Sequence, residues 1–230
     1  MKIYIAFILL FLGLGLQAQH TTRVVDPSIR TLRVRYLSEA IEPSGDVQRP
    51  YLVIKDGVVD GTDEKNILEI SFDNLSHDIK QYTYCVLHCD RNWHESPINS
   101  YEYLDGFTTN DIVDFELSIN TQQEYTHYWL EFPNTNMQLK ASGNYVLQIY
   151  QDGDPNQVVA EVCFQVVEPI AEAVVNLRHN TDIELSGRYQ QLDIDVNTSQ
   201  LKMNDVQNVA LVVTQNGRID NCVMLNKPTF

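Results

Sequence analysis

Residues 144–167 read NYVLQIYQDGDPNQVVAEVCFQVV, and this stretch decides the fold class. Two runs rich in Val, Ile, Phe and Tyr, at 144–150 and 158–167, flank the sequence Asp-Gly-Asp-Pro-Asn at 152–156. β-branched and aromatic residues favour extended backbone, whereas Gly, Asp, Asn and Pro favour tight turns. The stretch therefore predicts a β-hairpin with its turn at 152–156.

Strand-like segments continue upstream of this hairpin. They alternate apolar and polar residues or are rich in β-forming residues, and turn residues separate them: 31–37, 67–72, 82–90, 111–119 and 125–132. Regular strands without helical crossovers predict an antiparallel all-β sandwich. Ser142-Gly143-Asn144-Tyr145 is typical of a late strand in an immunoglobulin-like sandwich, where a tyrosine often closes the corner.

A second set of strands is predicted after Glu168-Pro169-Ile170, which breaks the pattern. These strands are expected at 173–178, 190–196, 209–214 and 221–225, with the hairpin signal Asn216-Gly217 between the last two. We therefore divide the chain into an N-terminal β-sandwich, residues 19–167, and the start of a second β-sandwich domain, residues 168–230. The second has 63 residues (168 to 230), against about 100 for an ordinary sandwich, so we expect it to be truncated.

The N-terminus predicts a secretory signal peptide, residues 1–18. Lys2 is followed by an apolar run from Ile3 to Leu16, and Ala18 is a small residue at the expected cleavage point. A transmembrane anchor is the alternative, but fourteen apolar residues are fewer than the ~20 that a spanning helix needs. Because Gln19 follows instead of a cysteine, acylation of a new N-terminal cysteine is not expected. The sequence thus predicts an exported protein.

The charge balance excludes some partners. The chain has 16 Lys and Arg residues against 31 Asp and Glu residues, a formal net charge of −15. Nucleic-acid binding needs a basic surface that displaces counterions, and an anionic bilayer would repel this chain. We therefore expect no nucleic-acid partner and no direct membrane insertion.

Four cysteines in an exported chain allow three disulfide pairings, and the sequence does not choose among them. A Cys85–Cys89 bridge is disfavoured because four residues of strand place the two residues ~13 Å apart. Cys163 and Cys222 lie in separate downstream segments. We favour the interpretation that the cysteines are small buried side chains.

Catalytic motifs are missing from the sequence. It has no Gly-x-Ser-x-Gly nucleophile elbow, no Gly-Lys-Ser/Thr phosphate loop and no His-Glu-x-x-His zinc helix. Asp152, Asp154 and Asn156 resemble the first half of a calcium loop, but Gln157 stands where Gly is needed and Cys163 where the bidentate Glu should be. The hairpin turn explains these residues better.

A zinc site is also disfavoured. His88, Cys89 and His94 are close in sequence, but on a strand His88 and Cys89 point to opposite faces, which leaves at most a pair of ligands. Acidic residues are so numerous that a catalytic carboxylate pair cannot be identified from spacing. We predict that the protein is not an enzyme, with no cofactor and no metal.

The most specific stretch runs from residue 67 to 145. Its blocks, in order, are ILEISFDNL (67–75), YTYCVLHCDRNW (82–93), SPINSYEYLDGF (96–107), SINT (118–121), YTHY (125–128), FPN (132–134) and SGNY (142–145). This series resembles the first domain of the type IX secretion system plug protein family of the Bacteroidetes. DPSIRT at 26–31 looks like the family's opening segment, and QNGR at 215–218 and KPTF at 227–230 look like part of its second domain.

The resemblance implies a non-enzymatic, periplasmic component that binds and plugs the periplasmic opening of the outer-membrane translocon barrel. It also selects residues as family signatures with a structural or partner-contact role: His88, Cys89, Asp90, Trp93, Glu102, Tyr103, Tyr125, His127, Tyr128, Pro133, Gly143 and Tyr145. The location it implies is the inner side of the outer membrane.

Two other classes of protein remain as alternatives. A carbohydrate-binding module would use exposed, coplanar rings, with Trp93, Trp129, Tyr101 and Tyr103 as candidates. An accessory sandwich of an exported hydrolase would be followed by a catalytic domain, whereas a plug protein would be followed by more β-sandwich.

Alternation predicts which strand faces are buried. On strand 82–90 we expect one face to be directed toward the core: Thr83, Cys85, Leu87 and Cys89. The other face is formed by Tyr82, Tyr84, His88 and Asp90, and we expect His88 and Asp90 to lie at an exposed or domain-facing surface. On strand 125–132 we expect three residues to face inward: Tyr128, Leu130 and Phe132. The opposite face is aromatic-rich and is either a partner-binding surface or a second packed layer: Tyr125, His127, Trp129 and Glu131. Trp93 is expected to pack in the core or at its rim.

Overall fold

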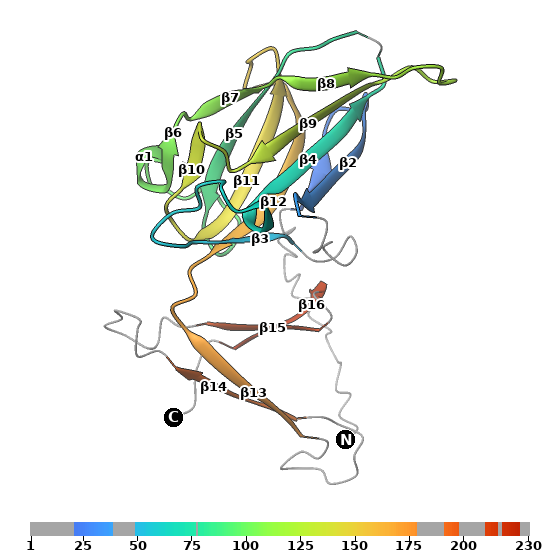
Figure 1. Cartoon of the computed structure of the whole chain (residues 1–230). Coiled ribbons are helices and arrows are strands. Elements are labelled where there is room, and N and C mark those ends of the chain that lie inside the picture. The colour runs from blue at the N-terminus through green and yellow to red at the C-terminus, as the bar shows by residue number, and fades with distance from the viewer. Residues whose placement is uncertain are drawn as a thin grey trace, which may run out of the picture.

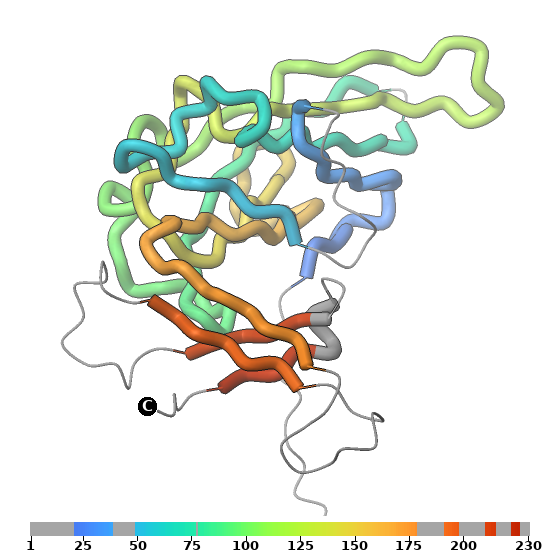
Figure 2. Tube along the Cα trace, turned by 60° about the horizontal axis from the view of Figure 1, so that its bottom comes forward, coloured from blue at the N-terminus to red at the C-terminus, as the bar shows by residue number. Residues whose placement is uncertain are grey.

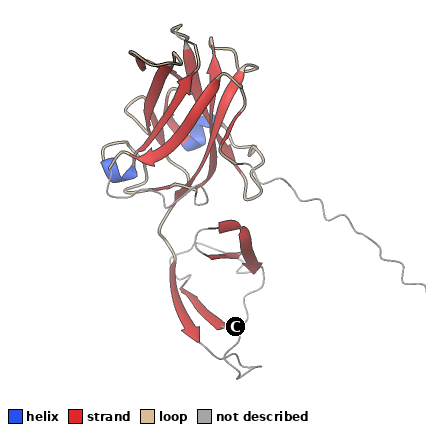
Figure 3. Cartoon of the chain, turned by 90° about the vertical axis from the view of Figure 1, so that its right-hand side faces the viewer, coloured by secondary structure: helices blue, strands red, loops and turns tan. Residues whose placement is uncertain are grey.

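The structure, a computed structural model, describes residues 21–38, 49–76, 78–178, 191–197, 210–215 and 218–225. The predicted signal peptide lies outside the described residues. Strands dominate the described part, and its helices are short (Figure 3). None of the helices in these ranges is long and apolar enough to cross a membrane. The predicted all-β class is confirmed.

The hairpin that decides the fold class forms as predicted. β11 (Gly143–Gln151) and β12 (Val158–Val167) pair antiparallel on either side of the 152–156 turn. They lie inside a six-stranded sheet (Figure 1), whose remaining members are β1 (Arg23–Val24), β3 (Tyr51–Val53), β5 (Tyr82–Cys89) and β7 (Thr109–Ile112). β3 joins β12 in parallel, whereas all the other pairs of described strands are antiparallel.

A second sheet packs against the first (Figure 1). Its four strands lie in the order β2 (Ile29–Tyr36), β4 (Leu68–Asn74), β9 (Thr126–Phe132) and β8 (Asp114–Leu117). Short elements complete this part of the chain: the 3-10 helix η1 (Glu64–Asn66), α1 (Ser100–Tyr103), β6 (Leu104–Gly106) and β10 (Met137–Leu139).

The core between the two sheets follows from alternation along β9. Tyr128, Leu130 and Phe132 are buried as predicted, and the residues between them are partly or fully exposed. The centre of the Tyr128 ring lies 5.3 Å from that of Phe72 on β4 and 4.8 Å from that of Tyr82 on β5. This aromatic cluster therefore joins the two sheets. Burial of each Leu or Phe of this kind stabilises the fold by roughly 1.5–3 kcal/mol.

The prediction for β5 was wrong, because its inward face is the opposite one. Tyr82 and Tyr84 lie in the main core, whereas Cys85 and Leu87 are only half-buried on the other side of the sheet. The Tyr82 hydroxyl is satisfied inside the core, where it accepts a hydrogen bond of 2.8 Å from Asn74 Nδ2. Since the hydroxyl has a partner, the large tyrosine ring can be buried at little polar cost.

The predicted strand 111–119 divides into two strands of different sheets. β7 pairs with β5 in the six-stranded sheet, and β8, which begins two residues later, pairs with β9 in the four-stranded sheet. Val113 lies between them at the crossover. The connection between β8 and β9, residues 118–125, projects beyond the rest of the sandwich (Figure 2).

The predicted downstream strands form two antiparallel hairpins. β13 (Glu172–Arg178) pairs with β14 (Gln191–Asn197), and β15 (Leu211–Gln215) pairs with β16 (Arg218–Leu225). Asn216 and Gly217 lie outside the described residues. Every residue of β13 is exposed. The domain boundary near residue 168 and the truncation of the second domain stay predictions.

All four cysteines are free thiols. Cys89 and Cys163 are buried in one small cluster, but β11 runs between their strands and its Val146 packs against both. Two strand spacings are about 9.6 Å, which exceeds the Cα separation that a disulfide tolerates. Cys85 and Cys222 are half-buried.

Candidate interaction surface

The outer face of the four-stranded sheet is the surface on which aromatic and charged side chains gather. Because alternate residues of β4 and β9 are buried, their neighbours must point away from the core. With the residues in register on β2 and β8, these side chains define the outer face: Arg33, Arg35, Glu69, Ser71, Asp73, Asp114, Glu116, His127, Trp129 and Glu131. The predicted outward orientation of the β9 residues is confirmed.

His127 and Trp129 form the centre of this face. The His127 Nδ1 atom lies 2.6 Å from Asp73 Oδ1 on the neighbouring strand. The imidazole ring also stacks on the indole ring of Trp129, with 5.7 Å between ring centres and 27° between planes. The carboxylate thus fixes the orientation of a half-exposed aromatic pair, which is an arrangement typical of interface hot spots.

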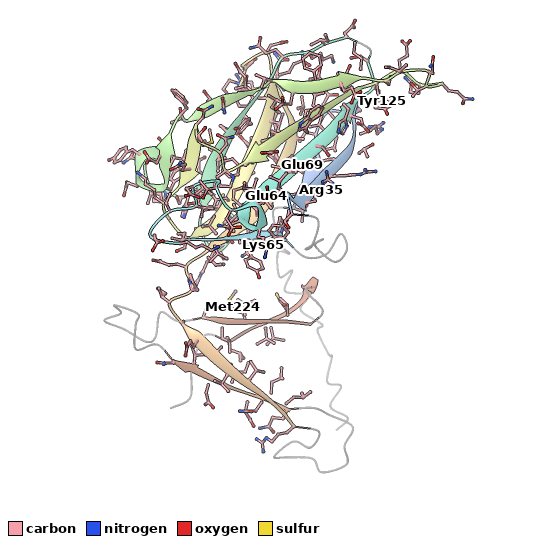
Figure 4. The ribbon with its side chains drawn as sticks, in the orientation of Figure 1. Arg35, Glu64, Lys65, Glu69, Tyr125 and Met224 are labelled. Atoms are coloured by element: carbon pink, nitrogen blue, oxygen red, sulfur yellow. The ribbon has the colours of Figure 1, made fainter. Side chains whose placement is uncertain are left out.

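Arg35 and Glu69 lie next to this centre, toward the β2 edge (Figure 4). The guanidinium donates two hydrogen bonds to the carboxylate, Nε to Oε1 at 2.8 Å and Nη2 to Oε2 at 3.0 Å. Arg33 follows the same edge. This bidentate geometry holds β2 and β4 in register at a modest gain in stability, because the arginine is half-exposed.

The opposite edge of the outer face is acidic. Asp114 and Glu116 on β8 are exposed, as is Glu131 at the end of β9. Within the part of the chain that the structure describes, these three carboxylates form no ion pair. The outer face therefore changes from basic at β2 to acidic at β8, with the aromatic pair between the two edges.

His88, a family-signature residue, lies elsewhere, half-buried near the end of β5. Its Nδ1 atom lies 2.7 Å from Ser96 Oγ and its Nε2 atom 3.2 Å from Ser142 O. A carbonyl oxygen can only accept, so Nε2 carries a proton and donates it. A Cβ atom at Gly143 would lie 2.3 Å from Nε2. His88 is thus half-buried and both of its ring nitrogens contact its own domain, and the exposed or domain-facing surface around it stays a prediction.

Two signature tyrosines pack against this histidine. The Tyr145 ring meets His88 edge-on at 5.0 Å, and the Tyr103 ring lies 5.7 Å from it. The Tyr145 hydroxyl donates to Ala141 O at 2.7 Å, which is the expected corner-closing contact, and the Tyr103 hydroxyl donates to Val86 O at 3.1 Å. Burial raises the pKa of both hydroxyls. These tyrosines have a structural role.

Asp90 and Trp93 shape the turn after β5. The backbone N–H groups of Asn92 and His94 donate to Asp90 Oδ1 at 2.7 and 3.0 Å. The bond from His94 N–H is the main cause that lowers the pKa of this carboxyl. Trp93 is half-buried against the cluster that contains Cys89, and the Arg49 guanidinium lies 3.9 Å from its ring centre. The prediction that Trp93 packs at the rim of the core is confirmed.

The remaining signature residues are also built into the fold. Glu102 accepts a hydrogen bond of 3.1 Å from Asn99 N–H and so caps α1. Pro133 is buried and follows a cis peptide bond. Tyr128 is fully buried, and its hydroxyl accepts from Lys80 N–H at 2.8 Å. Tyr125 is half-buried just before β9, where the connection from β8 ends (Figure 4).

Most of the signature residues thus have structural contacts, and His127 alone among them belongs to the outer face. Reasoning from sequence missed Arg35, Glu69 and Asp73 as neighbours of the aromatic pair. Each lies on the polar side of an alternating strand, which is a signal that the sequence holds. Which strands are adjacent depends on sheet order, which the sequence does not give.

The aromatic side chains do not form a row of sugar-stacking platforms. Trp93 is covered by Arg49, and Tyr103 is buried. Trp129 is half-buried under His127. Of the four candidate rings only Tyr101 faces solvent, with 70% of its surface exposed. The carbohydrate-binding alternative therefore gains no support.

Comparison with known proteins identifies the sandwich. Residues 56–168, which contain the strands from β4 to β12, match the family described as Type 9 secretion system plug protein 1st domain. A crystal structure of a hypothetical protein from Parabacteroides merdae is similar, with a TM-score of 0.72 and 33% sequence identity over 90% of this chain. The chain spans 49% of the length of that protein.

No curated protein matches the chain. The family match, however, includes every one of the signature residues, and the resemblance that they carry is confirmed. Residues 56–168 of this chain thus match the first domain of the type 9 secretion system plug proteins, the family that the sequence resembles.

Proposed function

We propose that this protein is a non-enzymatic periplasmic component of the type IX secretion system that binds and plugs the periplasmic opening of the outer-membrane translocon barrel. The observation that carries the proposal is the family match over residues 56–168, which contain the sandwich strands from β4 to β12. This match connects the chain to type IX secretion. Plugging of the barrel, and the barrel as the partner, are the proposed steps.

Physical considerations support a folded sandwich in this role. A wide translocon lumen would leak solutes whenever no substrate fills it, so its closure needs a body that does not deform. The core of this domain contains rings in edge-on and stacked contact from both sheets, such as Phe72, Tyr82 and Tyr128. Interiors packed in this way have low compressibility.

The outer face supplies a surface with which the sandwich can dock. Half-buried Trp129 under His127 offers an aromatic anchor, and the charged residues around it offer a polar rim. Interfaces combine a desolvated centre of this kind with a solvated rim. We assign the contact with the translocon to this face.

Affinity purification tests the proposal. The tagged protein, expressed in its own cells, should co-purify with the translocon barrel, and deletion of its gene should make the outer membrane permeable when the barrel is idle. Trp129→Ala should lower the co-purified amount at least ~10-fold, since truncation of a hot-spot residue costs about 2 kcal/mol or more. Tyr101→Ala is the matched control, because Tyr101 is exposed and lies outside the outer face.

The outcomes separate the function from the surface. If wild-type protein never co-purifies with the barrel while it remains in the periplasm, the plug function is wrong. If wild-type and Trp129→Ala proteins co-purify equally, the function stands and the outer face is not the contact. A mature protein that begins at Gln19, measured by mass spectrometry, would establish export through the predicted signal peptide.

A further inference from the structure

β8 is an edge strand of its sheet. The order of the four-stranded sheet ends at β8, and the six-stranded sheet ends at β7, the strand that directly precedes it. Residues 109–117 therefore form the edge of both sheets on the same side of the sandwich. The connection that follows β8, residues 118–125, projects beyond the body of the domain (Figure 2), and no described strand pairs with the far side of β8, so this edge is open to a partner.

The free side of β8 has unused backbone groups. Ser118 N–H donates to Tyr125 O at 2.9 Å, which makes 118 and 125 a hydrogen-bonded pair of the β8–β9 ladder. In an antiparallel ladder such pairs alternate, so residues 114 and 116 also face β9. The N–H groups of Phe115 and Leu117 then point away from β9. No described strand lies on that side of β8.

The side chains of this edge form an apolar row. Val113, Phe115, Leu117 and Ile119 occupy alternate positions, and Phe115 shares the inner face with Tyr128, its partner on β9. Val113 is 73% exposed, Phe115 39% and Ile119 76%. Exposed edges are normally blunted by charge, proline or a covering element. On β8 the charged side chains, Asp114 and Glu116, lie only on the outer face of the sheet, and the row of apolar side chains on the inner face has no charge.

We propose that β8 accepts an extended segment of another protein as a fifth strand of the four-stranded sheet, and that this segment alternates apolar and basic residues. Its backbone would use the free N–H and C=O groups of β8. Its apolar side chains would cover the row that begins at Val113. Its basic side chains would lie opposite Asp114 and Glu116. The Cβ atoms of residues directly opposite each other in such a pair are roughly 4.5–5.5 Å apart.

Charge complementarity selects this occupant. Asp114 and Glu116 form no ion pair in the described part of the chain, and the whole chain has a net charge of −15. A second copy of this chain would bring the same two carboxylates to the interface, where like charges directly opposite each other are destabilising. The proposal depends on β8 alone and does not require the translocon as the partner.

Peptide binding tests the proposal on the full chain. The probe is a short capped peptide that alternates lysine and valine and carries a fluorescent label, with anisotropy as the readout. It should bind about tenfold more tightly than a peptide that alternates glutamate and valine. Its affinity should also be higher, by a similar factor, than that of a control peptide in which the same numbers of lysines and valines are arranged in two separate blocks. Equal binding of the alternating and block peptides would show charge attraction without strand addition and would overturn the proposal.

Variants of β8 sharpen the test. Leu117→Pro removes an N–H group that β9 does not use and should reduce binding about tenfold, whereas Leu117→Thr keeps that group and should bind nearly as well. Replacement of Asp114 and Glu116 by lysine should reverse the preference between the lysine and glutamate peptides. This exchange involves exposed side chains, so it remains informative even if the proline variant unfolds.

Sedimentation velocity over a range of protein concentrations supplies the last control. The full chain should remain a monomer. Concentration-dependent dimers that Leu117→Pro abolishes would show that β8 pairs with a second copy, and would overturn the assignment of a basic segment. If the variant with lysine at positions 114 and 116 still prefers the lysine peptide to the glutamate peptide, the assignment of a basic segment is overturned as well.

Discussion

His88 shows how a residue characteristic of a family can be held by contacts within its own domain. Its Nδ1 and Nε2 atoms both contact the domain, through Ser96 and Ser142. The backbone of Gly143 packs so closely that it leaves no room for a side chain. The His88 ring on β5 and the Gly143 backbone at the start of β11 are therefore in close steric contact, which we call the His88–Gly143 lock.

Gly143→Ala tests this lock. The new Cβ atom would lie 2.3 Å from His88 Nε2, and φ at Gly143 is +153°. We expect a loss of about 2 kcal/mol in the free energy of unfolding, measured by urea titration. Gly153→Ala is the matched control, because its φ is +70° but nothing lies within 4 Å of the added atom. It should cost only the backbone strain, about 1 kcal/mol.

A double variant separates the clash from other effects. His88→Ala removes the atoms that the new Cβ would strike, so Gly143→Ala should cost clearly less in that background than alone. Equal cost in both backgrounds would show that Gly143 is required for its backbone conformation and not for the space beside His88.

At the scale of the strand, alternation determines how much the sequence reveals. On β9 the inward residues Tyr128 and Leu130 alternate with His127 and Glu131, and the buried face was predicted correctly. On β5 both faces contain apolar residues, such as Val86 and Leu87, so the pattern did not identify the core side. The hydroxyls of the inward tyrosines find partners outside β5, Asn74 for Tyr82 and Asn134 for Tyr84, which alternation along the strand does not reveal.

The sequence also did not predict the very short strands or the point at which the chain passes from one sheet to the other. β3, β6 and β10 have three residues each, which is too few for a periodic signal. The break between β7 and β8 arises because the two halves of one extended run pair with different strands. Pairing of this kind depends on tertiary position and not on local residue preference. The same limit hid the β2 and β4 members of the outer face.

The contact between β2 and β4 yields a prediction at this scale. A double-mutant cycle with Arg35→Ala and Glu69→Ala should give a coupling energy below about 1 kcal/mol, because the arginine is half-exposed and solvent screens the pair. The coupling should fall further in high salt. A coupling above about 2 kcal/mol that is insensitive to salt would contradict this account.

For the molecule as a whole, the sandwich should be stable without the downstream hairpins. In the described residues, no strand from β13 to β16 pairs with a strand of the sandwich. The face of β13 and β14 that carries Val175, Leu177 and Leu192 remains largely exposed. Isolated two-stranded hairpins are marginal in water. This supports the domain boundary that we propose near residue 168.

A fragment of residues 21–168 tests that boundary. Its free energy of unfolding in urea should agree with that of the sandwich transition in the full chain within about 0.5 kcal/mol. The near-ultraviolet circular dichroism of its buried tyrosines should be retained. A fragment that is unfolded, or that is weaker by about 2 kcal/mol or more, would show that the hairpins stabilise the sandwich.

The tyrosine-rich core makes a prediction about pH. Burial raises the pKa of Tyr82, Tyr84 and Tyr145 above the ordinary value. Below a pH of about 10 these hydroxyls are protonated in both the folded and the unfolded state. Above it the unfolded chain ionises and the folded chain does not, so stability is lost as pH rises. Urea titrations from neutral to alkaline pH should show this decline, and a constant free energy of unfolding would refute it.

The strand β11, which separates Cys89 from Cys163, has a consequence for the oxidative chemistry of the compartment that we propose. Burial raises the pKa of the Cys89 thiol to about 11 and that of Cys163 to about 12, so neither is a thiolate at neutral pH. In the folded molecule these two thiols are thus protected from thiol oxidants, and they become reactive only when the chain unfolds. Alkylation of Cys89 and Cys163 by iodoacetamide, followed by peptide mass mapping, should therefore be slow in the native protein and should reach completion only in denaturant.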